Sequence, residues 1–420
     1  MDAPWLMTML VLAATQPSCT KRNSDICCDT IDQCTQAGID ASDGFAHCDE
    51  GVCVNYTCVA SGCDDDGDCH DPNHPMCVSG QCYGPAEACR DRGGFQILFL
   101  SNRSGVSQIY RSFADGSGVT RITQDEMSLL YRITPSPDGA RLAYIQHGDV
   151  FTVSTNGEQP KQLTADTLNA DVHWSPDATM LAVSPEPVVG ATAFTMRSDG
   201  TQRHEFVVPG YITRNPAWSP DSTQVAFVTE SDSLMENNLW VANADGSAAR
   251  ELAGGFTPQL AEGADPAWKP DGSVIAAVFP EDFVDPNHRS TIFLKPTDGS
   301  PGSFFGPRGF PMWDVGWAHD GAKLLSVRSN SSSAQAESDP AGTQIAVMNS
   351  DGSNLYVIGS GFHAMHPRWS PDDKYIIFQD KTSQGDLEIY RMNADGANVL
   401  NLTMSSSDDF EPEWAACPVL

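Results

Sequence analysis

The chain has 420 residues, with 55 acidic and 24 basic residues and a formal net charge of -31. An acidic excess of this size argues against a protein that binds nucleic acid through its phosphates and against one that docks on an anionic membrane surface, since both need basic patches. The 35 Gly and 28 Pro residues favour short strands and tight turns over long helices.

The N-terminus predicts export. The apolar run Trp5–Ala14 is followed by small and polar residues, as in a signal peptide, so we expect residues 1–18 to be one. Cys19 ends a Gln-Pro-Ser-Cys sequence that loosely resembles a bacterial lipobox, which predicts lipidation of Cys19. The alternative is ordinary cleavage a few residues earlier. No apolar run reaches the length of a membrane span, so we expect membrane attachment only through this lipid anchor.

Cysteine usage separates residues 19–90 from the rest of the chain. Twelve of the 13 Cys lie in Cys19–Cys89, and the last is Cys417. In an oxidising compartment, such density predicts disulfides, whose connectivity the sequence leaves open. One spacing occurs twice: Cys28-x5-Cys34 with Cys48-x4-Cys53, and Cys63-x5-Cys69 with Cys77-x4-Cys82. The segment resembles the Cys-rich repeats near the N-terminus of bacterial surface lipoproteins. A zinc site using His70 and His74 is the weaker reading, because the first copy lacks both.

The large segment is built from repeats. Trp-Ser-Pro-Asp or a degenerate copy recurs, and an Asp-Gly or Asn-Gly turn follows each copy after a short apolar strand. Each unit therefore predicts four antiparallel strands, which is the pattern of a propeller blade. The Trp positions, with Pro in the first, are Pro135, Trp174, Trp218, Trp268, Trp317, Trp369 and Trp414.

These seven phased units resemble the TolB-like, or WD40-like, β-propeller repeat family over roughly residues 95–416. The resemblance implies an all-β, seven-bladed propeller spanning residues 91–420, behind the small disulfide-rich segment. The first unit starts at Phe95–Ser101 without its innermost strand, and Phe410–Trp414 supplies that strand from the other end of the chain. Such a clasp removes the open sheet edges. Cys89 and Cys417 flank it, so we expect a disulfide between them.

The candidate binding site is a ring of polar residues. The residue three places before each repeat Trp is polar in all seven units. Because the Trp strand is innermost, these side chains are expected around the axial channel, on the face of the long variable loops. Four carboxylates there would attract a cation or a basic partner. Their mutual repulsion should raise some of their pKa values unless something neutralises them. The plainer reading is that residues near solvent are simply polar. The ring is Arg132, Asp171, Asn215, Asp265, Asp314, His366 and Glu411.

No catalytic motif accompanies the repeats. The sequence has no Gly-x-Ser-x-Gly elbow, phosphate-binding loop or His-Glu-x-x-His, so it predicts no catalytic residue, cofactor or metal. The family resemblance implies a non-enzymatic, monomeric binding scaffold of the bacterial envelope, in the periplasm or at the outer membrane or cell surface. Its partner would be a protein or a cationic ligand. The alternative is a propeller enzyme, such as a polysaccharide lyase with an axial metal, for which His363 and His366 are the best candidates.

Overall fold

The computed structural model describes residues 94–417 except 125–129, 187, 189, 232–235, 257–264, 281–289, 307–310, 330–341 and 359–362, together with Cys89 and five short strands before it. The chain divides into two compact units, Met1–Arg92 and Gly93–Leu420. Among the described residues, no helix is long and apolar enough to cross a membrane.

The described strands of the first unit include a hairpin in each copy of the Cys repeat. The first hairpin pairs Cys48 with Gly51, and the second pairs Cys77 with Cys82. The turn of the first copy therefore lies one residue nearer to its leading Cys than the turn of the second copy. The strands are β1 (Phe45–Cys48), β2 (Gly51–Val54) and β3 (Thr57–Ala60) in one sheet, and β4 (Met76–Val78) and β5 (Gln81–Tyr83) in another.

The second unit consists of seven antiparallel four-stranded sheets, the blades, which we number I to VII. From the axis outward, the strands are β9 (Leu130–Pro135), β10 (Arg141–Gln146), β11 (Asp149–Ser154) and β12 (Lys161–Gln162) in blade I; β13 (Asn169–Trp174), β14 (Met180–Pro185), β15 (Phe194–Arg197) and β16 (His204–Glu205) in blade II; β17 (Ile212–Trp218), β18 (Gln224–Ser231), β19 (Glu236–Asn243) and β20 (Arg250–Phe256) in blade III; β21 (Ala267–Trp268), β22 (Val274–Pro280), β23 (Ser290–Pro296) and β24 (Ser303–Phe305) in blade IV; β25 (Met312–Trp317), β26 (Lys323–Ser329), β27 (Thr343–Asn349) and β28 (Tyr356–Ile358) in blade V; β29 (Met365–Trp369), β30 (Tyr375–Lys381), β31 (Leu387–Asn393) and β32 (Leu400–Asn401) in blade VI; and β33 (Asp409–Ala416), β6 (Phe95–Ser101), β7 (Gln108–Phe113) and β8 (Thr120–Arg121) in blade VII.

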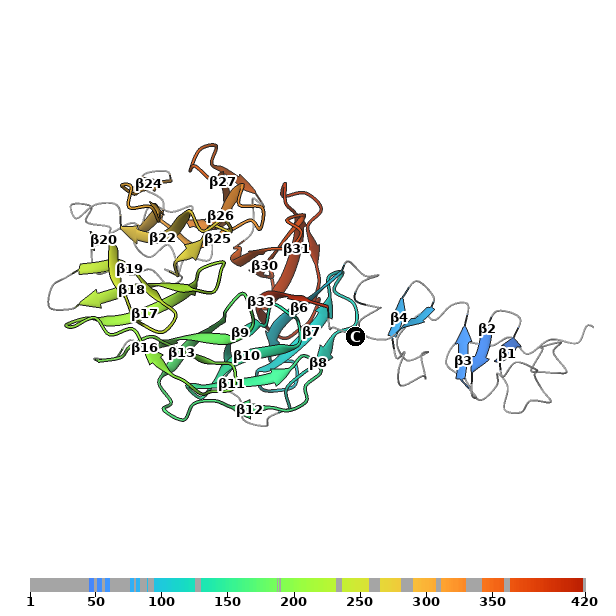
Figure 1. Cartoon of the computed structure of the whole chain (residues 1–420). Helices are drawn as coiled ribbons and strands as arrows, with labels where there is room; N and C mark the ends of the chain where they lie inside the picture. The colour runs from blue at the N-terminus through green and yellow to red at the C-terminus, as the bar shows by residue number, and fades with distance from the viewer. Residues whose placement is uncertain are drawn as a thin grey trace, which may run out of the picture. The chain divides into compact units, whose positions relative to one another are not determined.

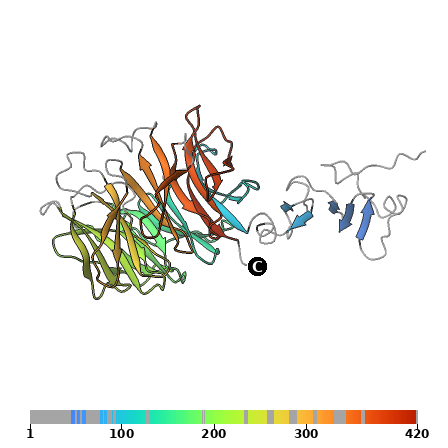
Figure 2. The same cartoon turned by 90° about the horizontal axis from the view of Figure 1, so that it is seen from above.

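The blades close into a ring. Each innermost strand contacts the innermost strands of both neighbouring blades, in the cyclic order β9, β13, β17, β21, β25, β29, β33 and back to β9. Figure 1 shows the blades following one another around the axis, from green through yellow to red. Figure 2 shows the red C-terminal strands beside the cyan N-terminal strands. The predicted seven-bladed fold is confirmed.

The clasp is also as predicted. β33 pairs with β6, so Trp414 lies opposite Ile97 and the last strand completes the blade that the first strands began. Arg103 holds this junction from the side, because its guanidinium makes two bonds of 2.7 and 2.8 Å to the buried Asp409 carboxylate. Cys89 and Cys417 are disulfide-bonded to each other.

The hydrophobic core lies between the blades. Seven clusters of buried side chains were found among the described residues, and each joins two neighbouring blades. The repeat Trp side chains belong to these seams: Trp218 is 8% exposed and Trp369 is 6% exposed. Burial of this apolar area between the blades is the main favourable term in holding the ring together.

The same Trp residues also hydrogen-bond across the seams. The indole N–H of Trp218 donates to the carbonyl of His173, one place before the Trp of blade II, at 3.2 Å. Trp174, Trp268, Trp317 and Trp414 make the equivalent bond to the preceding blade. The indole Nε1 of Trp369 is the exception: it is buried without a hydrogen-bond partner.

This difference predicts unequal effects of the same substitution. Trp218→Phe removes a seam hydrogen bond as well as part of the ring, whereas Trp369→Phe removes only the ring area. We expect the free energy of unfolding to fall by about 1 kcal/mol more for Trp218→Phe than for Trp369→Phe. Chemical denaturation of both variants measures the difference, and equal losses would show that the seam bonds contribute nothing net.

The Ser-Pro-Asp sequence closes the turn between the first two strands of a blade. In blade III the hydroxyl of Ser219 donates to the carboxylate of Asp221 at 2.6 Å and accepts the N–H of Gln224 at 2.9 Å. Ser175 and Ser370 make the same pair of bonds in their own blades. The repeated turn acids are therefore occupied by local hydrogen bonding, and the ligand-binding candidates lie elsewhere.

Candidate functional site

A repeated β-bulge positions the predicted ring. In blades III, V, VI and VII the innermost strand carries one extra residue relative to its neighbour, and the ring residue is the first residue inside the bulge. Blade I has its bulge at Arg132, and blade II has one just before Asp171. A bulge bends the strand and re-aims a side chain. The same local distortion thus recurs where the sequence places a polar residue.

The bulged residues are held in a left-handed backbone conformation. The φ angles are 43° for Arg132, 53° for Asn215 and Asp314, 50° for His366 and 54° for Glu411. None of them is Gly, so each conformation costs about 1 kcal/mol or more. Strain of this kind persists where the surrounding structure enforces it, and it is concentrated at binding and active sites. The same left-handed conformation at five ring positions indicates that the direction of these side chains matters.

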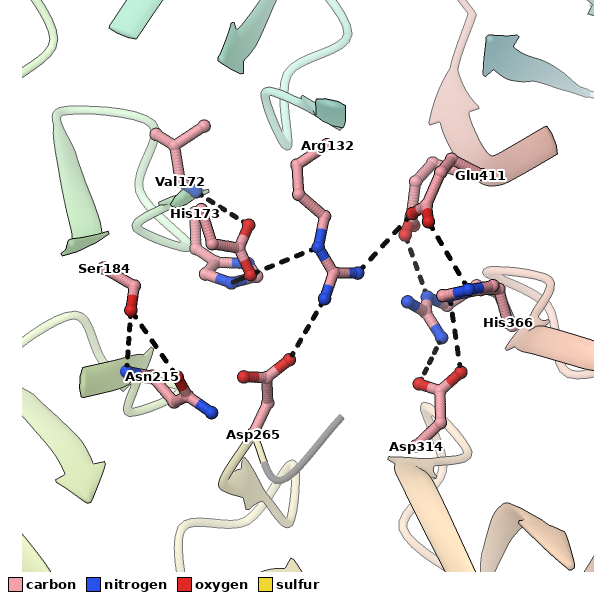
Figure 3. Close-up of polar contacts among 12 residues, drawn as sticks. Arg132, Val172, His173, Ser184, Asn215, Asp265, Asp314, His366 and Glu411 are labelled. Carbon is pink, nitrogen blue, oxygen red and sulfur yellow. Dashed lines mark hydrogen bonds and ion pairs between the residues drawn. The ribbon is translucent and has the colours of Figure 1, made fainter. Parts of the chain in front are cut away.

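Arg132 lies between carboxylates from three other blades (Figure 3). Its guanidinium is 3.5 Å from Asp171 Oδ2, 3.9 Å from Asp265 Oδ2 and 3.5 Å from Glu411 Oε2. These are long separations, because a direct charge-assisted N–H···O bond is about 2.7–2.9 Å. Arg132 therefore offsets the acidic groups without binding any one of them closely.

A second set of ion pairs joins blades V, VI and VII. His366 lies 3.7 Å from Asp314 and 3.4 Å from Glu411. Arg368 makes two close bonds, each of 2.8 Å, to Asp314 Oδ1 and Glu413 Oε1. Arg368 is thus the tightly bound arginine of the site, in contrast to Arg132.

Three functional residues were missed from the sequence: His173, Arg368 and Glu413. Each stands one place before its repeat Trp, two residues after a ring position. Strand side chains alternate with a period of two, so positions three and one before the Trp share a face wherever the strand is regular. That alternation was the available signal, although the residue types at this position differ from blade to blade.

Asn215 does not join the other ring residues. Its backbone N–H donates to the hydroxyl of Ser184 at 3.1 Å, and the same hydroxyl donates to its Oδ1 at 3.5 Å. Figure 3 shows this pair beside the group that surrounds Arg132. Blade III next presents Ala217, which is small. Blade III consequently contributes fewer polar atoms to the axis than its neighbours.

Four of the other ring residues, Arg132, Asp171, Asp265 and Asp314, line a cavity of about 230 Å³, and His366 and Glu411 are not part of its lining. Its described lining comes from every blade except blade III. The polar lining residues are Arg132, Thr134, Asp171, His173, Asp265, Asp314, Arg368 and Glu413. A cavity of this size has room for several water molecules or a small polar group.

Carboxylates outnumber guanidinium groups at the axis. Asp171, Asp265, Asp314, Glu411 and Glu413 face two arginines, which leaves an excess of three negative charges before any histidine is protonated. The predicted acidic character of the ring is therefore retained. Among the described residues, Asp265 forms one ion pair, with Arg132 at 3.9 Å, and no hydrogen bond.

The pKa shifts in the cluster have opposite signs. Burial raises the pKa of Asp265, and repulsion from Asp171 adds to the rise, which attraction by Arg132 and His173 does not cancel. For Asp171, burial also opposes ionisation, but attraction by His173 and Arg132 outweighs it and holds the pKa below the usual range. The pKa of Asp314 is likewise lowered, since Arg368 and His366 overcome its burial. The sequence predicted raised pKa values for some of the acids unless something neutralised them: the pKa of Asp265 is raised, and neighbouring cations neutralise Asp171 and Asp314.

Other predicted site residues lie apart from this cavity or outside the described residues. The backbone N–H of His363 donates to Asp380 at 2.8 Å, and its Nδ1 is buried without a partner, so only His366 of the two histidines belongs to the ring. Cys19 and most of the long variable loops lie outside the described residues.

Comparison with known proteins agrees with this fold. The family described as the TolB beta propeller domain matches residues 200–418. Tricorn protease homolog 1 of Streptomyces coelicolor is 29% identical over 256 residues, which are 55% of this chain and 23% of that protein. The TolB homolog of Chlorobium luteolum is 28% identical over 145 residues, 32% of each chain. The chain thus spans less than a third of the length of these relatives.

A solved structure extends the match to nearly the whole propeller. The oligogalacturonate lyase of Vibrio parahaemolyticus superposes with a TM-score of 0.55, covering 72% of this chain and 87% of that one. Sequence identity over this match is 16%, so the likeness is one of fold.

Proposed function

The chain belongs to the TolB beta propeller domain family, and on this premise we propose that it is an exported, non-enzymatic binding scaffold of the bacterial cell envelope. Its binding site is the axial cavity. The observation that carries the proposal is the recurring bulge, which directs polar side chains from successive blades into one place at a cost in backbone energy.

The charge at the axis selects the kind of partner. An excess of three carboxylates in a partly enclosed site attracts positive charge, and the low-dielectric walls of a cavity concentrate the field. We infer that the partner is a protein that inserts a basic segment, with a lysine side chain reaching the acids that Arg132 leaves without a close bond.

A matched pair of peptides tests this function. Fluorescence anisotropy would compare an extended lysine-containing peptide with the same peptide carrying norleucine in place of each lysine. The lysine peptide is expected to bind more tightly, with an affinity that falls as salt is added. Replacing Asp171, Asp265 and Asp314 together with Asn should abolish the preference. Equal binding of both peptides, or an unchanged preference in a folded triple variant, would contradict the proposal.

A second candidate function is a propeller enzyme, such as a polysaccharide lyase that uses an axial metal. The fold shared with the oligogalacturonate lyase and the mixed carboxylate and histidine lining of the cavity favour testing it. Incubation with oligogalacturonate, followed by detection of an unsaturated product, would decide. Turnover that chelators abolish would support the enzyme. An absence of turnover with every divalent metal tested would favour the binding scaffold.

The localisation we propose is the periplasm or the outer membrane or cell surface, with Cys19 lipidated. If the anchor is present, wild-type protein should fractionate with membranes and Cys19→Ser should become soluble. One acyl chain binds membranes only weakly, so stable anchoring requires the several chains of a lipoprotein. Identical fractionation of both proteins, or a mature N-terminus upstream of Cys19, would show that the lipobox interpretation is wrong.

A further inference from the structure

We propose that Asp171, His173 and Asp265 form a binding site for a first-row divalent metal ion such as zinc, on the side of the axial cavity between blades II and IV. The three side chains offer two carboxylate oxygens and one imidazole nitrogen that all lie within 4.8 Å of one another. This goes beyond the binding function proposed above, because it assigns a particular ion to particular residues.

The first two ligands are already at a coordinating separation. His173 Nε2 lies 3.1 Å from Asp171 Oδ2. Two ligand atoms at 2.0–2.2 Å from a tetrahedral metal stand about 3.4 Å apart. A metal can therefore occupy the position between these atoms with little movement of either side chain. Asp171 is also fixed by its other oxygen, which accepts the N–H of Val172 at 2.7 Å.

The third ligand comes from across a gap. Asp265 belongs to blade IV. Blade III stands between it and Asp171, and the ring residue of blade III, Asn215, bonds to Ser184. The residue before the Trp of blade III is the small Ala217. The absence of blade III from the described lining leaves the space between the two aspartates open to the cavity. Asp265 has no hydrogen bond among the described residues that would have to break before it bound a metal.

Arg132 is the competing cation, and its geometry allows displacement. The guanidinium stands 3.5 Å from Asp171 and 3.9 Å from Asp265, well beyond the 2.8 Å bonds that Arg368 makes in the same cavity. Glu411, at 3.5 Å on the far side of Arg132, remains available to pair with the guanidinium after a metal binds. The remaining negative charge of the ring offsets the added positive charge.

The donor set indicates the class of metal. One imidazole with two carboxylates suits zinc and manganese, whereas calcium and magnesium prefer sites made of oxygen ligands alone. Three protein ligands leave a coordination position open, and the cavity of about 230 Å³ has room for a water molecule on it.

Isothermal titration of the full-length oxidised protein with zinc chloride tests the site. We expect a binding event in the wild type that His173→Ala and Asp265→Asn each weaken roughly tenfold or more. His204→Ala is the matched control, because it removes a histidine on the outermost strand of the same blade, away from the ring, and should leave that event unchanged. Circular dichroism would confirm that each variant is folded. Magnesium chloride should give no comparable event.

The outcomes separate this inference from the proposed function. No zinc event in the wild type, an event that survives in folded His173→Ala protein, or equal loss in His204→Ala would overturn the metal site. None of these results tests the proposed function, which the lysine-peptide experiment tests separately. If both ligands use the cavity, saturating zinc should weaken the lysine peptide in the wild type and have less effect in His173→Ala.

Discussion

Replacing Cys417 with Ser is expected to lower the free energy of unfolding by up to about 5 kcal/mol. The disulfide to Cys89 closes a loop of more than 300 residues, and cross-linking such a loop removes a large conformational entropy from the unfolded chain. The bond also lies directly after β33, the strand that completes blade VII. Equilibrium denaturation in urea, with and without a reducing agent, measures the loss.

The double variant with Ser at both Cys89 and Cys417 is the control for a free thiol. It should be as destabilised as the single variant, and a reducing agent should have no further effect on its propeller transition. Non-reducing peptide mapping provides an independent check. An unchanged transition in Cys417→Ser protein, or a map that pairs Cys89 within residues 19–90, would show that the clasp is held by strand pairing alone.

We expect Asp171→Asn to lower the free energy of unfolding by about 3 kcal/mol at neutral pH, because it removes the carboxylate of a buried group of ion pairs and leaves the cations in place. The side chain of Asp171 is 10% exposed, and it pairs with both Arg132 and His173. Removing its charge leaves His173 without its paired carboxylate and Arg132 with only its pairs to Asp265 and Glu411. Urea denaturation at pH 7 measures the loss, and a variant as stable as the wild type would mean that the attraction within the group does not exceed its desolvation cost.

Asp265→Asn should have the opposite sign. The pKa of Asp265 is raised by burial and by repulsion from Asp171, so its ionised form is disfavoured in the folded protein and replacement by a neutral amide should stabilise the propeller. Each variant changes one aspartate of the same cluster to asparagine, so each serves as the control for the other.

The pH dependence follows from the same shifts. The folded pKa of Asp171 is lowered, so its stabilising contribution is complete above the unfolded value of about 4 and is lost as the pH falls below it. The loss caused by Asp171→Asn should therefore shrink on acidification. The folded pKa of Asp265 is raised, so its cost disappears as the pH falls through that value, and the gain from Asp265→Asn should shrink as well.

The blades were predictable because each is a local structure. Four strands joined by Ser-Pro-Asp and Asp-Gly turns lie within about 50 consecutive residues, and the turn chemistry sets where each strand ends. The clasp was predictable for the same reason, since an incomplete first unit and a lone last strand can only complement each other. Both inferences depend on the order of the strands within a repeat and on the point at which the chain enters that order, and a single sequence is enough to read both.

The side-chain arrangement at the axis was only partly predictable. Counting back from each Trp located the ring, but the left-handed bulges arise from how the inner strand pairs with its neighbour, and no residue type in the ring signals them. Asn215 turns to Ser184, a contact that depends on the spacing between two blades. Arg368 reaches Asp314 and Glu413 for the same reason.

The most direct test of the axial site is the melting temperature of wild type and Asp265→Asn, each with and without saturating lysine peptide. Without peptide, the variant should melt at a higher temperature than the wild type. The peptide should raise the melting temperature of the wild type more than that of the variant. A variant that melts lower than the wild type and gains as much from the peptide would contradict both predictions.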